Sequence, residues 1–592
     1  MSNIFKKLFF SILAITTIVG CQKDNIIDID PVDADNADDY IANTVFSDTV
    51  HVYFTSNGEA TVTGATDSHN VSVSGNGVTI AYDGEEAIMY ILSGTTSNGY
   101  FKLYGSHKQG ITLDGVTIAN SKGAAINVQG PESNPAKGKR TFIVVTGSNT
   151  LRDGTSYTNT PDGEDEKATI FGEGKMIFSG DGSLDITAQG KSGVASDDYV
   201  SLLDAPTITI NSTAGHGIKA NDYISISAGT LSISTTAATK KGLSTKGYVI
   251  VKGGQTDINV SGNAAYDSDD NEYSGTAGIK ADNYFKITDG TINITNSGAG
   301  GKGISSDGNG FFAGGSVGIA TTGANYTQGS ISSKGIKFDG DLEFSGANVT
   351  VKCNWHEGIE AKGTIIVSGG TVYSYSGRDD GINSGSDFTI SGGKVCGYAT
   401  SNDGLDANGD FYIKGGIVYA IGSSSPEVAV DANTEQRHKL YVEGGTIVAI
   451  GGLENGSSLT QSCYSASWSQ NTWYGMAVGS TTHAFKTPSA GGTPLVVSGA
   501  SSPSLTSGVS ASGGTSHFEG LLLTDVAVSG GTSVTLSAYS GGNGISFLKY
   551  SITVLNFSSV CPFCFRAFLK SFLKPLQIEV VTIIIETVCP KM

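Results

Sequence analysis

Three consecutive segments of the chain share one pattern: HEGIEAKGTIIVSGG (356–370), DDGINSGSDFTISGG (379–393) and NDGLDANGDFYIKGG (402–416). In each segment an acidic residue precedes a glycine, an apolar residue follows that glycine, and a Gly-Gly pair closes the segment. Between the glycines, β-branched and aromatic residues alternate with polar ones, which is the two-residue period of a β-strand. Three copies in one phase indicate a repeat protein made of strands.

The first glycine of the pattern, called the marker glycine below, recurs about every 23–25 residues, with two longer intervals at 242–278 and 303–335. This period is typical of solenoids and too short for a propeller blade. The leucine-rich signature is absent, and no window has sustained helical spacing. The sequence therefore predicts an all-β fold, a right-handed parallel β-helix. The marker positions are Gly193, Gly217, Gly242, Gly278, Gly303, Gly335, Gly358, Gly381 and Gly404, followed by Ala429.

Each repeat divides into three short predicted strands. The first follows the marker glycine, and the second begins seven residues after it with an apolar residue such as Ile365 or Phe388. A Gly-Gly corner, for example 369–370, then leads into the third strand, since glycine adopts positive φ at little cost. Stacking such coils ~4.8 Å apart would bury the apolar rows as continuous ladders. The longer intervals are expected to be loop insertions, the first being SGNAAYDSDDNEYSG (261–275).

The composition fits this fold and limits the classes of partner that the protein can bind. The chain of 592 residues has 82 Gly and only 12 Pro, and its formal net charge is −19. A nucleic-acid partner is not expected, because phosphate binding needs a surplus of Lys and Arg on some face.

The N-terminus carries a sorting signal. Lys6 and Lys7 precede a short apolar run, and the run ends at Cys21 in a sequence that resembles the bacterial lipobox. We expect residues 1–21 to be a lipoprotein signal peptide, Cys21 to be lipidated, and residues 22–48 to be an acidic tether. The protein would then be a lipoprotein of the bacterial outer membrane or cell surface, touching the membrane through its lipid anchor only. A plain signal peptide that contains a cysteine is the alternative.

The remaining boundaries follow from loss of the repeat. Residues 49–452 are assigned to the β-helix and residues 453–545 to a β-rich C-terminal cap that would protect the last coil. Residues 546–592 form an irregular tail with almost no glycine, which suggests an altered reading frame or a wrong stop. Its single Cys561-x-x-Cys564 has neither a second pair nor a nearby His pair to make a zinc site.

Taken together, the recurring DGI-x-A/S, D-[LYF]-x-I and I-x-GG-T-V-x-A resemble the secreted carbohydrate-binding parallel β-helix proteins, which are related in fold to calcium-dependent pectate and pectin lyases. The resemblance covers residues 71–450. It implies binding of a cellulose-like or acidic plant polysaccharide, with calcium in the helix.

Acidic residues at two phased positions form the candidate metal site. Equivalent positions stack one coil apart in a parallel solenoid, so like charges would lie about 5 Å from one another. A bound cation would relieve the repulsion, and carboxylate and amide oxygens are the ligands that calcium prefers. Solvated surface ladders are the alternative. The candidate ligands are Glu357, Asp380 and Asp403 before the marker position, and Glu360, Asn383, Asp406 and Asp431 after it.

Four tyrosines, each six residues after its marker, form a second candidate site for carbohydrate: Tyr199, Tyr223, Tyr248 and Tyr284. Alternation places these rings outside the core or at a corner. Exposed rings could stack on sugar faces. A structural ladder of rings stacked on one another is the alternative.

No catalytic residue is assigned. A lyase needs an unprotonated base, and Lys334, Lys337, Lys362 and Arg378 lie near the acidic ladder. A lysine beside carboxylates more often forms an ion pair and keeps its proton. Three functions therefore compete: a polysaccharide-binding lipoprotein stabilised by calcium, a calcium-dependent polysaccharide lyase, and an adhesin or structural solenoid without a sugar ligand. The first is preferred, and enzymatic activity is the less favoured reading.

Overall fold

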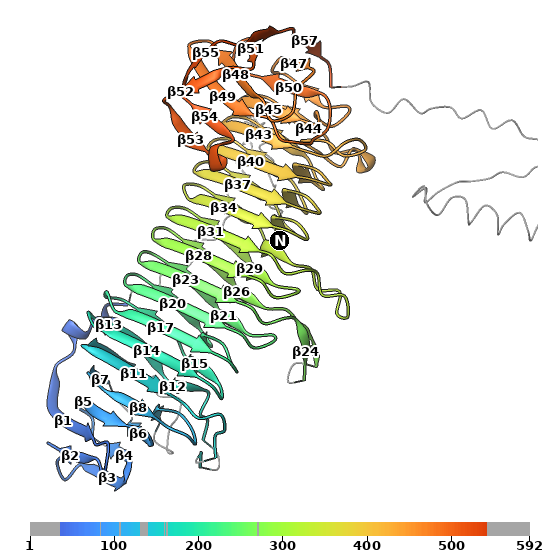
Figure 1. Cartoon of the computed structure of the whole chain (residues 1–592). Helices are drawn as coiled ribbons and strands as arrows, with labels where there is room; N and C mark the ends of the chain where they lie inside the picture. The colour runs from blue at the N-terminus through green and yellow to red at the C-terminus, as the bar shows by residue number, and fades with distance from the viewer. Residues whose placement is uncertain are drawn as a thin grey trace, which may run out of the picture. The chain divides into compact units, whose positions relative to one another are not determined.

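The structure is a computed structural model that describes residues 36–541, apart from 83, 106–107, 131–139, 159, 162–163 and 269–270. The predicted signal peptide, the predicted lipidation site Cys21 and the irregular tail lie outside these residues. Within them the chain winds through successive coils whose strands form three parallel sheets (Figure 1). The predicted parallel β-helix is confirmed. None of the described helices is long and apolar enough to cross a membrane.

The first sheet contains the strands that follow the marker glycines. Its apolar row is fully buried and continuous, as in the pairing of Ile359 with Ile382 and of Ile382 with Leu405. Its strands are β3 (His69–Ser74), β4 (Asn76–Tyr82), β6 (Gly99–Gly105), β9 (Ile126–Gln129), β12 (Ala168–Gly172), β15 (Ser192–Ser196), β18 (Ile218–Ala220), β21 (Lys241–Thr245), β26 (Ala277–Ala281), β29 (Lys302–Ser306), β32 (Lys334–Phe338), β35 (Ile359–Ala361), β38 (Ile382–Ser384) and β41 (Leu405–Ala407).

The second sheet begins seven residues after each marker, as the sequence predicts, and stacks Ile365 on Phe388 and Phe388 on Phe411. Its strands are β1 (Phe46–Phe54), β5 (Ala87–Thr96), β7 (Gln109–Asp114), β10 (Arg140–Thr146), β13 (Lys175–Gly180), β16 (Val200–Leu202), β19 (Tyr223–Ile226), β22 (Tyr248–Val251), β27 (Tyr284–Ile287), β30 (Asn309–Phe312), β33 (Leu342–Phe344), β36 (Ile365–Val367), β39 (Phe388–Ile390), β42 (Phe411–Ile413), β44 (Leu440–Val442) and β46 (Ser458–Leu459).

The third sheet follows the Gly-Gly corners, and the second glycine of each pair has the expected positive φ, 74° at Gly370 and 71° at Gly393. Its parallel strands are β8 (Thr117–Ala119), β11 (Ser148–Arg152), β14 (Ser183–Ala188), β17 (Thr207–Ser212), β20 (Thr230–Thr235), β23 (Gln255–Val260), β28 (Thr291–Asn296), β31 (Ser316–Thr321), β34 (Asn348–Cys353), β37 (Thr371–Ser376), β40 (Lys394–Ala399), β43 (Ile417–Ile421) and β45 (Thr446–Ile450).

The marker glycines are required for a different reason from the corner glycines. A Cβ built on Gly217 would lie 2.5 Å from Cγ2 of Ile233 and 2.6 Å from the carbonyl oxygen of Gly242. The same geometry recurs at Gly242, where the Cβ would meet Ile258 at 2.4 Å. In these coils the marker position therefore faces the core, where the third sheet leaves no room for a side chain, whereas the last marker position holds Ala429.

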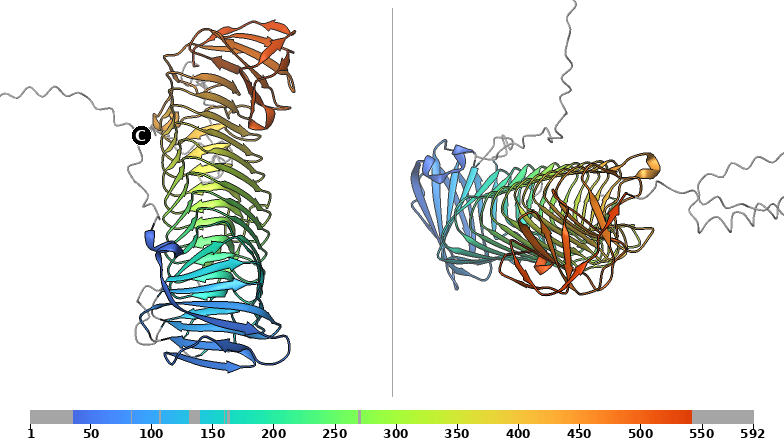
Figure 2. Two further views of the ribbon diagram at one scale, coloured as in Figure 1. Left: turned by 90° about the vertical axis from the view of Figure 1, so that its left-hand side faces the viewer. Right: turned by 90° about the horizontal axis from the view of Figure 1, so that it is seen from above.

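Antiparallel strands close both ends of the coil stack (Figure 2). At the first end β2 (Thr61–Thr63) pairs with β1, and β3 pairs with β4. At the last end β45 pairs antiparallel with β50, a strand of the cap. The cap strands are β47 (Cys463–Ala466), β48 (Trp473–Val478), β49 (Thr481–Lys486), β50 (Leu495–Ser498), β51 (Ser504–Ser507), β52 (Ser510–Ser512), β53 (Thr515–His517), β54 (Leu522–Thr524), β55 (Ala527–Ser529), β56 (Thr532–Val534) and β57 (Ser537–Tyr539).

Folded structure begins inside residues 22–48, the segment predicted to be a tether. Two 3-10 helices, η1 (Ala37–Asp39) and η2 (Ile41–Asn43), precede β1, which already begins at Phe46. Asp39 is buried and accepts hydrogen bonds from Arg140 (Nε, 2.8 Å) and from the hydroxyl of Tyr199 (2.5 Å). These buried contacts hold residues 37–48 on the coils. Two more 3-10 helices are η3 (Thr434–Gln436) and η4 (Phe518–Gly520).

Candidate functional site

One row of outward-facing side chains runs along the first sheet from β18 to β41 and changes sign part of the way along. Strand register places these residues in one line, each directly over the next. The row is basic or neutral as far as Lys337 and neutral or acidic from Glu360 onward. Its members are Lys219, Ser244, Lys280, Ser305, Lys337, Glu360, Asn383 and Asp406.

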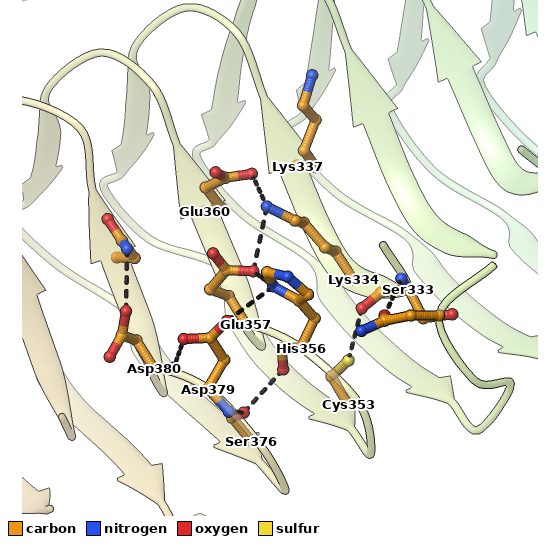
Figure 3. Close-up of polar contacts among 12 residues, drawn as sticks. Ser333, Lys334, Lys337, Cys353, His356, Glu357, Glu360, Ser376, Asp379 and Asp380 are labelled. Carbon is orange, nitrogen blue, oxygen red and sulfur yellow. Dashed lines mark hydrogen bonds and ion pairs between the residues drawn. The ribbon is translucent and has the colours of Figure 1, made fainter. Parts of the chain in front are cut away.

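At the point where the sign changes, the acidic residues are neutralised by neighbouring cations. The Nζ of Lys334 lies 3.1 Å from Glu357 and also donates to Glu360, and the imidazole of His356 contacts Glu357 (Figure 3). His356 also lies 3.0 Å from Asp379. The first two predicted ligands, Glu357 and Glu360, are therefore already partnered.

The pKa values at this junction reflect the same contacts. Burial would lower the pKa of His356, but its hydrogen bonds to Asp379 and Glu357 raise it to about 9, so the ring is an imidazolium at neutral pH. Burial would raise the pKa of Glu357, but His356 and Lys334 hold it below its usual value. A protonated imidazole cannot ligate a metal. This group is therefore an ion-pair network, and His356 is a member that the repeat pattern did not predict.

Further along the same face lies an acidic cluster of Asp403, Asp406 and Asp431, called the carboxylate triad below. Each residue offers a carboxylate oxygen, and the three oxygens lie within 4.8 Å of one another. Register produces this arrangement, because Leu405 pairs with Val430 and so aligns the residues that follow them. Within the described residues no lysine or arginine forms an ion pair with the triad.

Burial, and then crowding, raises the pKa values of these carboxylates. Burial, backed by neighbouring carboxylates, raises the pKa of both Asp403 and Asp406 to about 9. Burial and Asp431 raise the pKa of Glu454 to about 8, and burial, Asp379 and Glu357 raise that of Asp380 to about 8. Repulsion without a counter-charge is what a bound cation would relieve. Clustered carboxylate oxygens suit a hard divalent cation such as calcium.

The two remaining predicted ligands lie between the ion-pair network and the triad. Asn383 donates its amide N–H to Asp380 (2.9 Å), and Asp380 also accepts the backbone N–H of Asp403 (3.1 Å). Asp403 in turn accepts the backbone N–H of Val428. The acids before the marker position thus connect successive coils, which leaves Asp403 both a structural acceptor and a member of the triad.

A second group of acids serves the turns between the first and second sheets. Asp387 accepts the backbone N–H of Asp410 (2.9 Å), and Asp410 accepts that of Lys439 (2.8 Å). His438 lies 3.5 Å from Asp410. Because their oxygens are used by backbone donors of the next coil, these residues are explained as structural acceptors.

The tyrosine column exists, and its rings stack on one another. Successive ring centroids lie 4.2, 4.9 and 4.7 Å apart at interplanar angles of 14°, 6° and 5°. Tyr199, at one end, is buried, and Phe311 meets the ring of Tyr284 edge-on at the other. The faces of Tyr223 and Tyr248 are therefore covered by their neighbours. This geometry favours the structural ladder, and carbohydrate binding by the column stays a prediction.

A different group of tyrosines lies in the two loop insertions. The first insertion forms a hairpin of β24 (Ala265–Asp267) and β25 (Glu272–Ser274), from which Tyr273 is exposed over 42% of its surface. Its ring lies 5.4 Å from that of Tyr266 and 6.2 Å from that of Tyr326 on the second insertion. The repeat pattern did not predict this group, because insertions have no register to extrapolate.

The lysines near the acidic ladder are ion-paired. Lys337 and Lys362 both contact Asp339, at 2.6 and 2.7 Å, and Lys334 is held by the two glutamates. The guanidinium of Arg378 lies 5.1 Å from the centre of the Trp355 ring. None of these four groups is set up as an unprotonated base.

Comparison with known proteins gives a family and one solved structure. A family described as carbohydrate-binding domain-containing protein matches residues 74–275 and 206–381, which together span more than half of the chain. The polysaccharide lyase-like protein from C. thermocellum has 22% sequence identity and a TM-score of 0.36, over 46% of this chain and 97% of that one. A sequence identity and a TM-score this low do not indicate a shared function. No curated protein matches the chain.

Proposed function

This chain belongs to the family of carbohydrate-binding domain-containing proteins, and on that premise we propose that it binds polysaccharide along the outward face of the first sheet. The observation that carries the proposal is the continuous row of outward polar side chains from Lys219 to Asp406. A straight row with one residue per coil presents regularly spaced hydrogen-bonding groups to a linear polymer. Tyr273, beside the row, offers an aromatic ring to a sugar face.

Calcium at the carboxylate triad is part of the proposal. The support is the convergence of three carboxylates that have no basic partner among the described residues, on coils where backbone register fixes their spacing. Glu454, which adjoins Asp431, is a further oxygen donor. Bound calcium would neutralise the acidic end of the row and make that end accessible to a glycan hydroxyl or carboxylate. The short leader that ends at Cys21 supports placing the protein on the bacterial cell envelope as a lipoprotein.

Calcium binding is tested by thermal unfolding with added calcium and with a chelator. A ligand that binds only the folded state stabilises it by about 2.7 kcal/mol at a hundredfold excess over Kd, so calcium should raise the Tm. Asp403→Asn combined with Asp406→Asn should remove most of that shift. The matched control is Asp185→Asn with Asp289→Asn, two exposed acids far from the triad, and it should keep the wild-type shift. Equal calcium-induced Tm shifts in both double variants would show that the triad does not bind the calcium.

Polysaccharide binding is tested separately, on a glycan array read with and without chelator. Binding to a polysaccharide without release of an unsaturated product supports the binding function. Appearance of the ultraviolet absorbance of an unsaturated sugar would instead establish a lyase. No binding to any glycan would leave the adhesin or structural solenoid as the function.

A further inference from the structure

A cavity of ≈230 Å³ opens on the basic half of the first sheet. Four lysines line it, together with Tyr273, Ser305 and one acid, Asp307, which is paired with Lys280. Two of the four belong to the outward row described above, and the other two come from the parallel row in which Lys241, Ala277, Lys302 and Lys334 are in register. The lining lysines are Lys241, Lys280, Lys302 and Lys337.

Most of these lysines have a partner, and one does not. Lys280 pairs with Asp282 and Asp307, and Lys337 pairs with Asp339. Lys241 donates to the hydroxyl of Ser274 (3.1 Å). Lys302 has no acidic partner within the described residues, although it is only partly exposed.

The lack of a counter-charge at Lys302 shows in its ionisation. Burial, and then the positive charges of Lys337, Lys334, Lys241 and Lys280, lower its pKa to about 8. A protonated Lys302 is therefore repelled from several directions, and a bound anion would remove that cost. The cavity is open and polar, so an anion could enter it with part of its hydration.

We infer that this cavity, the lysine pocket, binds the anionic group of an acidic saccharide, a carboxylate or a sulfate ester, through the ammonium groups of Lys302, Lys241 and Lys337. The inference rests on the proposed function and names its substrate class. Tyr273 lines the same cavity, so the sugar ring that carries the anion can lie against an aromatic side chain. Ser305 supplies a hydroxyl for a neutral sugar oxygen.

The position of the pocket agrees with a glycan that runs along the sheet. From β29, which carries Lys302, to β41, which carries Asp406, there are four ladder steps, or about 19 Å at ~4.8 Å per strand. An acidic polysaccharide bound in the pocket would therefore reach the carboxylate triad with a later sugar. A calcium ion at the triad would reverse the charge that otherwise repels such a chain.

The test compares an acidic oligosaccharide with a neutral one, using isothermal titration of the full-length protein. Oligogalacturonate is the acidic probe and cello-oligosaccharide the neutral one. Lys302→Gln should weaken oligogalacturonate binding at least tenfold and leave cello-oligosaccharide binding unchanged. Lys286→Gln is the matched control, because it removes a lysine of the neighbouring second-sheet strand β27, and it should bind both probes as the wild type does. Lys302→Gln should keep or raise the wild-type Tm, since it relieves repulsion.

Equal oligogalacturonate affinity in Lys302→Gln and Lys286→Gln would overturn the lysine pocket while leaving polysaccharide binding intact. Wild-type binding of cello-oligosaccharide without oligogalacturonate would likewise overturn the lysine pocket alone, whereas binding of neither would overturn the proposed function as well. A second measurement locates the bound anion. Lys302 should react early with an amine-acylating reagent, and oligogalacturonate should protect it. Protection by inorganic sulfate alone would make the pocket a site for a free anion and overturn the saccharide assignment.

Discussion

At the scale of single residues, glycine has two separate tasks in this solenoid. The second glycine of each corner, such as Gly370 with φ +74°, has a backbone conformation that other residues rarely adopt. The marker glycine has ordinary backbone angles and is needed because its missing side chain admits a neighbouring isoleucine. The sequence predicted the first task. The second could not be predicted, because it depends on the distance between two sheets.

Substitution of a marker glycine should destabilise the fold. In Gly242→Ala the new methyl group would lie 2.4 Å from Cγ2 of Ile258 and 2.6 Å from the carbonyl oxygen of Gly278. Overpacking of this kind costs about 1–3 kcal/mol, measured as a drop in the free energy of unfolding. Gly318→Ala is the control, since its methyl group would meet the end of the Asn293 side chain at 3.1 Å and no backbone atom closer than the carbonyl oxygen of Ile292 at 4.0 Å. An unchanged stability in Gly242→Ala would show that the sheets can separate.

The carboxylate triad should make calcium-free protein less stable as pH rises. Asp403 and Asp406 have pKa values of about 9 when folded, against ~3.9 when unfolded. Between these values the folded state binds more protons, so stability is full below about pH 4 and is lost progressively as pH rises to about 9. In chelator, Tm measured from pH 5 to 9 should therefore fall more steeply in wild type than in the Asp403→Asn, Asp406→Asn double variant. Parallel curves would contradict the crowding.

At the scale of strands and coils, register explains which part of the acidic arrangement could be predicted from the sequence and which part could not. The marker phase placed Asp403, Asp406 and Asp431 together, because stacked coils bring equivalent positions into contact. The marker phase could not show that the side chain of Lys334 extends to Glu357 and Glu360 on the next coil. A long side chain selects its partner by rotamer and distance, which the repeat period does not contain.

The two tyrosine groups should respond differently to mutation. Tyr223→Ala interrupts the stacked column between rings 4.2 and 4.9 Å away, so it should lower the Tm with little change in glycan affinity. Tyr273→Ala removes an exposed ring beside the lysine pocket, so it should weaken glycan binding severalfold at unchanged Tm. Circular dichroism melts and titration calorimetry measure both quantities. The reverse pattern would return the sugar site to the column.

At the scale of the whole molecule, the solenoid was predictable because each coil repeats the pattern of the one before it. Its ends were not predictable in detail, since closing strands follow no repeat: β1 begins at Phe46, inside the segment expected to be a tether. Asp39, buried against Arg140 and Tyr199, fastens this N-terminal segment to the coils. If Cys21 is lipidated as predicted, at most the residues between Cys21 and about Asn36 separate the lipid from the folded body.

The lipid anchor itself gives the last prediction. The sulfur of Cys21 is the atom that would carry the lipid. Cys21→Ser should therefore leave the protein unlipidated and release it from membranes. Two or more acyl chains anchor a protein stably, whereas none leaves only weak surface contacts. Detergent phase partitioning of the wild type and the variant measures the difference, with Cys353→Ser as a control for loss of a thiol in the folded body. Recovery of Cys21→Ser in the detergent phase at the wild-type level would show that residues other than Cys21 hold the protein at the membrane.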